Sequence, residues 1–281
     1  MSESISGIVR GNDRMLRDEF VGQLEEVCRR LAVDVVWSAD RWVAQLITPG
    51  RRAFVVGYDF DLNGSAAAQL SIDKAATSET LQSYGVPTVD HILLTTDDGT
   101  QLDFRHHLPV GVKFPLVVKP NRGFNGHDVT LTTCRDEFRA AYESLQKKHA
   151  DVAVSPYIAA AGEYRVIVLD DDVLLTYRKV LTDQGEGEPE WRFNAEFGST
   201  AELVSPDAAA YPALSDLAHR AMRTLGLRLA AVDIMESIEG ELSVMEINAD
   251  FSMNYFSRQS PENRTVVIDL LTTVVASRLR K

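Results

Sequence analysis

The chain has 281 residues, which is enough for one large domain or two to three small lobes. With 45% apolar and 25% charged residues, it can bury a core. Its net charge of −12 argues against a nucleic acid or an anionic membrane as partner, because no basic excess is available to neutralise phosphates. The sequence contains no apolar run of about 18 residues that would predict a membrane span, and its N-terminus lacks the apolar segment of a signal peptide. Cys28 and Cys134 match no metal-binding spacing, so we expect reduced thiols in a cytoplasmic protein.

The N-terminal part reads as a small α/β unit. Apolar residues at helical spacing predict a helix over residues 13–31, and the runs "DVVW" and "RAFVVGY" that follow predict two buried strands. A further helix is expected from Ser71, which can cap it. Its apolar stripe would include Leu81 and Tyr84, and Gly85 would end it.

The middle and last parts alternate strands and helices. "FPLVVKP" and "VTLTT" predict a strand and its return, followed by an amphipathic helix "CRDEFRAAYESLQKKH" and a strand "DVAVSPYI". A hairpin around Asp170–Asp172, a helix over residues 207–226, a second hairpin and a closing helix complete the chain, with residues 183–190 as a candidate mobile loop. We therefore predict an α/β (α+β) protein in three parts, residues 1–72, 73–156 and 157–281.

The last predicted hairpin carries acidic side chains where a buried strand would be apolar. With a loop of residues 238–241, Asp233 falls directly opposite Glu246, and Asn248 lies on the same face two residues on. Opposed like charges destabilise a strand pair, whereas two carboxylates and an amide oxygen suit a hard cation such as Mg²⁺. A solvated sheet face that carries acids by chance is the alternative, and the spacing alone does not decide between them.

A glycine-containing turn follows the strand that ends at Lys119. Gly123 and Gly126 in this turn would let successive backbone N–H groups wrap an anion. The glycine patterns of P-loops and of dinucleotide-binding folds are absent, and an ordinary hairpin loop is the alternative interpretation.

The hairpin around Asp170–Asp172 carries several charges. Glu163 faces Lys179 in the expected register, Arg165 lies on the same face, and Arg178 points the other way. The basic residues could clamp phosphates, or they could form cross-strand ion pairs of little energetic weight. The aspartates themselves indicate a solvated turn.

Isolated residues give weaker signals. Lys74 at a helix start is most simply a solvent-exposed lysine, and the pair His106–His107 lacks a third ligand at a metal-binding spacing. His127 could do no more than close its own turn.

The order of these features resembles the ATP-grasp superfamily over roughly residues 60–260. A lysine, a strand lysine with a glycine turn, an acid-bearing strand, a basic hairpin and the pattern Asp…Glu-x-Asn follow one another, as in the carboxylate–amine ligases. These include D-alanine–D-alanine ligases, glutathione synthetases, cyanophycin synthetases and ribosomal-protein glutamate ligases. The resemblance implies an ATP-grasp fold, with two lobes that clasp ATP and a small N-terminal α/β lobe.

The resemblance also implies roles for individual positions. The ATP-binding residues would be Lys74, Lys119, Arg122, Gly123, Asn125, Gly126, Tyr157, Ile158, Glu163 and Asn194. Among these, the residues of the glycine turn would close over the triphosphate, Tyr157 and Ile158 would meet the adenine, and Glu163 would bind the ribose. The residues that face the γ-phosphate or an acyl-phosphate would be Arg165, Arg178 and Lys179. The magnesium ligands would be Asp233, Glu246 and Asn248, with Mn²⁺ as an alternative ion.

The sequence departs from the family after the metal motif. Many relatives continue with a Pro-Gly turn beside the acceptor substrate, whereas this chain reads "NADFSMNYF". Asp250, Ser252 and Asn254 are therefore the substrate candidates, with Asp250 able to attract an amine by charge. The short N-terminal lobe leaves room for a homodimer that shares substrate binding.

The leading hypothesis is an ATP-dependent ligase that joins the carboxylate of an amino acid or small peptide to an amine through an acyl-phosphate, releasing ADP and phosphate. Cationic side chains and Mg²⁺ would stabilise the transferring phosphoryl group, so no protein nucleophile is needed. Phosphoryl transfer without amide formation and a non-catalytic ATP-binding module are the alternatives. Opposed carboxylates disfavour the second alternative, because a binding module has no need of them.

Overall fold

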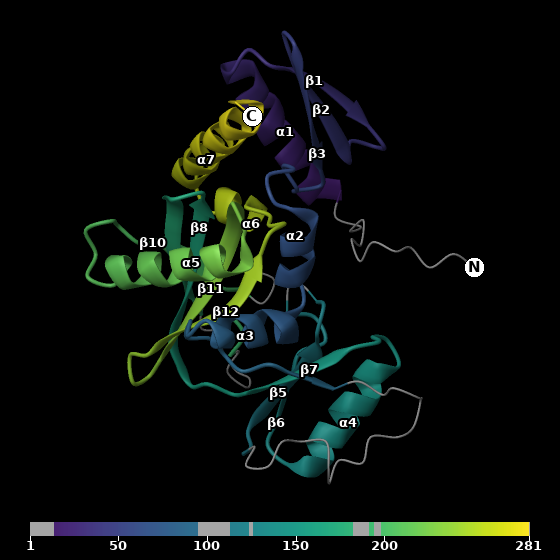
Figure 1. Cartoon of the computed structure of the whole chain (residues 1–281), viewed down its shortest axis with the longest axis vertical. Coiled ribbons are helices and arrows are strands. Elements are labelled where there is room, and N and C mark those ends of the chain that lie inside the picture. The colour runs from purple at the N-terminus through teal and green to yellow at the C-terminus, as the bar shows by residue number, and fades with distance from the viewer. Residues whose placement is uncertain (1–13, 95–112, 124–125, 182–190, 194–197, 281) are drawn as a thin grey trace. The chain divides into compact units, whose positions relative to one another are not determined.

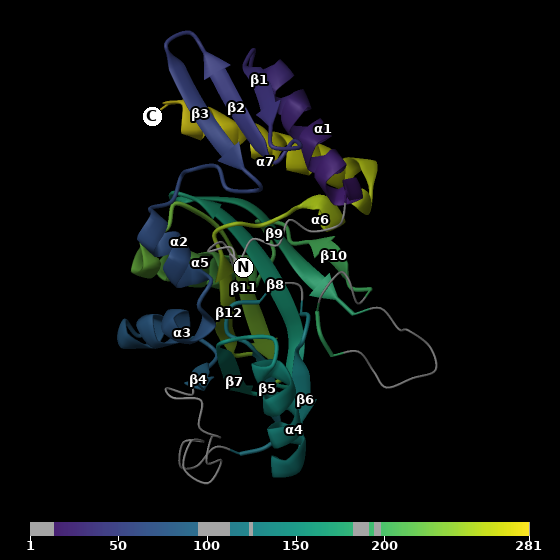
Figure 2. The ribbon, with the colours of Figure 1, turned by 90° about the vertical axis from the view of Figure 1, so that its right-hand side faces the viewer.

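The structure is a computed structural model that describes residues 14–94, 113–123, 126–181, 191–193 and 198–280. The described residues divide into two compact units, one within residues 1–64 and 249–281 and the other within residues 65–248. Each unit is described by itself below (Figures 1 and 2). Among the described helices, none combines the length and the apolar character that crossing a membrane requires.

The first unit is a three-stranded antiparallel sheet with helices on one face. Its elements are α1 (Arg14–Arg30), β1 (Asp34–Ser38), β2 (Val43–Thr48), β3 (Arg51–Val56), α6 (Asn254–Arg258) and α7 (Pro261–Arg280). Ala44, Leu46 and Val55 are buried on the inner face of the sheet, against which α1 and α7 pack (Figure 2). The sequence predicts only two of these strands and omits β2, in which the polar Gln45 interrupts the apolar run.

The larger sheet of the second unit has the order β10-β9-β8-β11-β12, with every neighbouring pair antiparallel. The elements are α2 (Ser65–Ser71), α3 (Lys74–Ser83), β8 (Ala160–Leu169), β9 (Asp172–Val180), β10 (Thr200–Leu203), α5 (Tyr211–Leu225), β11 (Leu229–Ser237) and β12 (Leu242–Asn248). Helix α5 lies across one face of this sheet (Figure 1) and buries Leu214, Ala218 and Met222. The opposite face is left for the polar residues described below.

The smaller sheet of the second unit has the order β4-β7-β5-β6, again antiparallel throughout. Its elements are β4 (Ile92–Leu94), β5 (Leu116–Pro120), β6 (Thr130–Thr132), α4 (Arg135–Gln146) and β7 (Val152–Pro156). Helix α4 packs Phe138, Tyr142 and Leu145 against Val118 and Val154 of the sheet. The predicted strand, return strand and amphipathic helix of this region are confirmed.

Helix α3 begins later than the sequence suggests. Ser71 ends α2 instead of capping the next helix, and Asp73 is the N-cap, whose side chain accepts a hydrogen bond from the Ala76 N–H at 3.1 Å. Aspartate at this position satisfies a backbone donor that the helix leaves unpaired. Tyr84 lies beyond the helix and is exposed rather than part of its apolar stripe, whereas Gly85, with a φ of 67°, ends the helix as predicted.

The β11–β12 hairpin has a shorter loop than predicted. The Ser237 N–H donates to the Glu241 carbonyl at 2.9 Å, so the loop is Ile238–Gly240, and Gly240 takes the left-handed conformation common in three-residue hairpin loops. A β-bulge between Asp233 and Ile234 restores the register, so that Asp233 still pairs with Glu246. The predicted opposition of these two residues is thus confirmed, although the loop that led to it is wrong.

Candidate functional site

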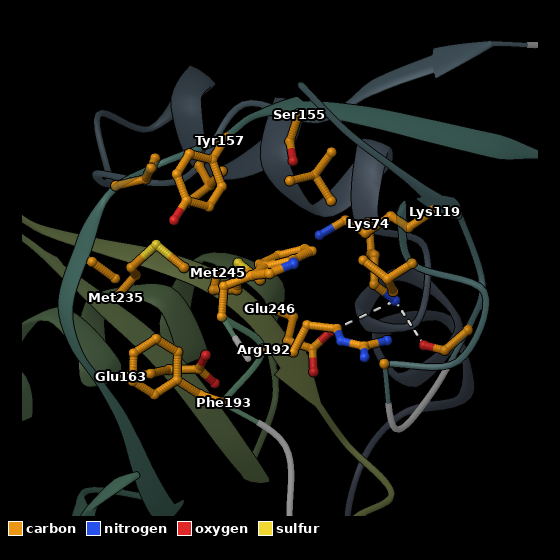
Figure 3. A pocket seen from close by; sticks show the side chains of 18 of the residues that line it. Lys74, Lys119, Ser155, Tyr157, Glu163, Arg192, Phe193, Met235, Met245 and Glu246 are labelled. Carbon is orange, nitrogen blue, oxygen red and sulfur yellow. Dashed lines mark hydrogen bonds and ion pairs between the residues drawn. The ribbon is translucent and has the colours of Figure 1, made fainter. Parts of the chain in front are cut away.

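A cavity of about 320 Å³ lies between the two sheets of the second unit (Figure 3). The predicted site residues that line it are Lys74, Lys119, Gly123, Gly126, Tyr157, Ile158, Glu163, Lys179 and Glu246. They come from α3, the smaller sheet and the larger sheet, so segments far apart in the sequence meet at one place. A volume of this size is typical of a small-molecule site.

Lys74 is the first residue of α3 and reaches from the helix start into the cavity. Its Nζ donates to the Gly123 carbonyl at 2.8 Å and lies 3.6 Å from Oε2 of Glu246 (Figure 3). The lysine therefore connects the glycine turn with the acidic strand β12. Its side chain is one-tenth exposed, so it is not the solvated lysine that the sequence alone would favour.

Lys119 ends the buried strand β5 with a side chain that is 3% exposed. Burial and the nearby Lys74 lower the pKa of Lys119 to about 8, although Glu246 and Glu163 oppose this shift. The ammonium groups of Lys74 and Lys119 repel each other, and an anion bound between them would relieve this repulsion. The pair is therefore suited to bind phosphate groups.

Asn121 fixes the two lysines relative to each other, a role that sequence reasoning missed. Its side-chain oxygen accepts from the Ala75 N–H at 3.0 Å, and its carbonyl accepts from the Lys74 N–H at 3.3 Å. Asn121 is fully buried and follows β5 directly, so it ties the start of α3 to the end of that strand. Arg122 turns away from the cavity lining and pairs with the cap residue Asp73 at 3.2 Å.

The polar face of the larger sheet is built around Asp233, which is 1% exposed. Arg165 on the neighbouring strand binds it with two hydrogen bonds, Nε to Oδ1 at 2.7 Å and Nη2 to Oδ2 at 2.6 Å. Lys179 lies 3.3 Å from the same carboxylate and also contacts Glu163. The predicted facing of Glu163 and Lys179 is confirmed by the β8–β9 register. Removing this carboxylate would leave the charges of Arg165 and Lys179 without their shared partner.

Glu246, like Glu163, is an acidic residue of this face that lines the cavity. Burial alone would raise its pKa, but Lys74, Lys119 and Lys179 together lower that pKa to about 2. The Asn248 amide donates to Oε1 of Glu246 at 3.2 Å and lies 3.5 Å from Oδ2 of Asp233. All three predicted metal ligands therefore lie together. Within the described residues, no set of three or more His, Cys, Asp or Glu side chains is arranged to hold a metal ion. The predicted set is of a different kind, because its third member is the amide of Asn248.

The other end of the cavity is apolar. Tyr157 and Met235 lie there, away from Lys119 (Figure 3), and the Tyr157 ring meets Trp191 edge-on at a centroid distance of 5.8 Å. The Tyr157 N–H donates to the Pro115 carbonyl at 3.1 Å, which anchors the segment that joins β7 to β8. A cavity with cationic residues on one side and aromatic and sulfur-containing residues on the other suits a ligand that is itself divided into anionic and flat apolar parts.

Several predicted residues do not lie at this cavity. Arg178 projects from the opposite face of the sheet and donates to the Ala161 carbonyl at 2.6 Å. Asp250, Ser252 and Asn254 belong to the first unit, where Asn254 donates to the Tyr58 hydroxyl at 3.0 Å. Burial and the neighbouring Asp59 raise the pKa of Asp250 to about 7. The predicted site residues Asn125 and Asn194, the pair His106–His107 and the loop at residues 183–190 lie outside the described residues.

The cavity also contains residues that the sequence did not single out. They are Trp191, Arg192, Phe193, Met235, Met245 and Ser155. The bulge in β12 accounts for one of them, because it lets the consecutive residues Met245 and Glu246 both line the cavity. Trp191–Phe193 directly precede Asn194, the predicted ATP-binding residue. This adjacency is the only feature of the sequence that points to them as cavity residues.

Comparison with known proteins identifies the family. Residues 71–271 match the model of the RimK-like ATP-grasp domain. A probable alpha-L-glutamate ligase of Xanthomonas campestris is 32% identical over 189 residues, which are 66% of this chain and 60% of that protein. A D-alanine–D-alanine ligase of Stutzerimonas stutzeri is 30% identical over 68% of this chain and 59% of that protein. The chain therefore spans about three fifths of the length of these relatives.

A solved structure shares the fold. The D-alanine–D-alanine ligase of Bacillus anthracis matches 78% of this chain and 70% of its own, with a TM-score of 0.60 and 22% identity. This likeness supports the predicted ATP-grasp arrangement of antiparallel sheets. The match of 201 residues, well over half of the chain, to one family model decides the assignment. The chain belongs to the RimK-like ATP-grasp domain family.

Proposed function

We propose that this protein is an ATP-dependent carboxylate–amine ligase that forms an amide bond through an acyl-phosphate. The observation that carries the proposal is the meeting of Lys74, Lys119 and Lys179 with Glu246 at one end of a single cavity. Such a set serves phosphoryl transfer, in which positioning and charge stabilisation do most of the work. Membership in the ATP-grasp family supports ATP as the phosphoryl donor.

The different chemistry of the two ends of the cavity suggests how ATP would be oriented. The triphosphate would lie at Lys74 and Lys119, beneath the turn that carries Gly123 and Gly126. The adenine would lie at the other end, between Tyr157 and the methionine side chains, with the backbone near Ile158 within reach of its edge. Glu163 lines the cavity and contacts Lys179, so a ribose hydroxyl would compete with that lysine for the carboxylate.

The residues present fit a magnesium ion. Asp233 and Glu246 would supply carboxylate oxygens, although Arg165 occupies both oxygens of Asp233 here. Asn248 donates its amide to both residues, and rotation of that amide by half a turn would present an oxygen instead. Glu246 is the more available carboxylate, because it lines the cavity and its nearest lysine, Lys74, is 3.6 Å away. Its pKa of about 2 keeps it anionic. A bound Mg²⁺ would neutralise charge on the phosphate oxygens. Mn²⁺ has the same ligand preferences.

The reaction follows from the weakness of a carboxylate as an acyl donor. A substrate carboxylate oxygen attacks the γ-phosphorus, the bond from that phosphorus to the β–γ bridging oxygen breaks, and ADP leaves. The amine then attacks the acyl carbon and phosphate leaves with the oxygen that the carboxylate contributed, while the amine loses a proton to solvent. The lysines stabilise the charge that spreads over the transferring phosphoryl oxygens.

The substrates we propose are an amino acid or a small peptide on each side of the new bond. One relative is named as a probable alpha-L-glutamate ligase, so glutamate is the first amino acid to test. Asp250, Ser252 and Asn254 replace the expected Pro-Gly turn after Asn248 and are proposed to contact the acceptor. We also propose that the chain is organised in three parts, residues 1–72, 73–156 and 157–281.

Incubation with ATP, Mg²⁺ and pairs of amino acids and dipeptides tests the function. The proposal predicts ADP release only when both a carboxylate and an amine are present, with a product of their summed mass less one water. ADP release with no amine requirement and a stable phosphorylated product would instead indicate a kinase. ATP binding with no ADP release from any pair would indicate a binding module.

A further inference from the structure

The outer face of the β1-β2-β3 sheet carries apolar side chains that face away from the helices of the first unit. Burial alternates along each strand, so the outward residues are Asp34, Val36, Ser38, Val43, Gln45, Ile47, Arg52, Phe54 and Val56. Val36 is 52% exposed on the edge strand β1, and Phe54 is 50% exposed on the other edge strand, β3. Helices α1 and α7 contact the other face of the sheet only (Figure 2).

The strand register arranges these residues in three rows across the sheet. Asp34, Ile47 and Arg52 form the first row. Val36, Gln45 and Phe54 form the second, and Ser38, Val43 and Val56 the third. Each row therefore begins on one edge strand and ends on the other, with a β2 residue at its centre.

We infer that this face binds the same face of a second copy of the chain about a two-fold axis parallel to β2. Such an axis places β1 of one copy over β3 of its partner within the same row. Asp34 then lies opposite the partner's Arg52, and Val36 lies opposite the partner's Phe54. The two-fold symmetry repeats each of these contacts on the other side of the axis. Gln45 lies on the axis, where two amides can exchange hydrogen bonds. A face that complements itself in charge and in apolar contact is what an isologous dimer requires.

Other two-fold arrangements of the same face lose this complementarity. An axis across the strands places β1 over β1 and pairs Asp34 with the partner's Ser38 and Arg52 with the partner's Val56. Orthogonal packing about one diagonal brings the two Asp34 side chains together, and about the other diagonal the two Arg52 side chains. Only the axis parallel to β2 opposes the two charges, and it agrees with the aligned packing that sheets favour.

The size of the face sets the strength of the contact. Three strands spaced about 4.8 Å apart and five residues of about 3.3 Å each offer a few hundred Å² per copy. Stable dimers bury about 800 Å² per partner. We therefore expect a weak dimer, whose formation depends on protein concentration.

Sedimentation equilibrium of the full chain over roughly 1–500 µM tests the inference. The mass should rise from 31.2 kDa toward twice that value. Phe54→Ser should weaken association at least about tenfold, whereas Tyr84→Ser, which changes an even more exposed aromatic residue of the second unit, should leave it unchanged. All of these residues are exposed, and circular dichroism confirms that each variant folds.

Charge reversal gives the sharper test. Asp34→Arg and Arg52→Asp should each weaken association, because each opposes like charges twice. The double variant should restore it, since the reversed charges again oppose each other across the axis. A chain that stays monomeric to about 500 µM, an association that Phe54→Ser leaves intact, or a double variant no better than the single ones would each overturn the inference.

Discussion

Asp233 and Glu246 face each other across the β11–β12 ladder, although like charges in directly opposed positions destabilise a strand pair. The structure reconciles them with a shared set of cations: Arg165 and Lys179 at Asp233, and Lys74 beside Glu246. The nearby lysines lower the pKa of Glu246 to about 2, and this carboxylate lines the cavity.

Glu246→Gln should reduce the rate of ADP release by at least about two orders of magnitude, because it removes the anionic ligand proposed for magnesium. The fold should persist, since the amide can still accept from Asn248. Glu241→Gln is the matched control, because Glu241 is exposed in the turn of the same hairpin. Steady-state rates of both variants check the prediction, and equal loss in both would remove Glu246 from the site.

ATP affinity should fall as pH rises through about 8. Burial and Lys74 hold the pKa of Lys119 at about 8, so this lysine loses the charge that attracts phosphate above that pH. The dissociation constant, measured by calorimetry with a non-hydrolysable ATP analogue, should increase by up to about tenfold per pH unit. Lys119→Arg should flatten the profile, because arginine stays protonated. A wild-type affinity that is constant to pH 9.5 would contradict the assignment.

Asp233→Asn should lower the free energy of unfolding by about 3–5 kcal/mol, because it leaves the buried cations Arg165 and Lys179 without their shared partner. Asp216→Asn is the comparison, since Asp216 is 66% exposed and lies 3.8 Å from Arg220. That change should cost less than about 0.5 kcal/mol. Urea unfolding at pH 7 measures both. A similar cost for the two substitutions would mean that the buried cluster does not stabilise the sheet.

Gly162→Ala should destabilise the protein by about 0.5–1.5 kcal/mol, the cost of displacing one arginine side chain from its rotamer. A Cβ at this position would lie 2.8 Å from Nε of Arg178, which packs over the glycine to reach the Ala161 carbonyl. Gly64→Ala, where a Cβ meets nothing within 4 Å, is the control. Thermal unfolding distinguishes them, and combining Gly162→Ala with Arg178→Ala should recover part of the loss. Full additivity of the two changes would show that the contact is not the cause.

Part of the site could be predicted from the sequence, because it lies within local hairpins. The facing of Glu163 with Lys179 follows from one turn and a two-residue alternation. The facing of Asp233 with Glu246 was reached through a loop one residue too long, and a bulge that no pattern indicated made the conclusion hold.

The remaining contacts depend on pairings between distant segments. The ion pair of Arg165 with Asp233 exists because β8 and β11, some 60 residues apart in sequence, are neighbours in the sheet. Asn121 joins α3 to β5 through bonds to backbone atoms, which leave no mark on residue spacing. Hydrophobic periodicity specifies which face of a strand is buried, but not which strand lies beside it.

The central claim is that a substrate carboxylate is activated as an acyl-phosphate, and the fate of its oxygen tests this most directly. The enzyme would be incubated with ATP, Mg²⁺ and a mixture of amino acids whose carboxyl groups carry ¹⁸O, and the released phosphate analysed by mass spectrometry. The account predicts one ¹⁸O atom in the phosphate for each amide formed. Amide formation with unlabelled phosphate would contradict it.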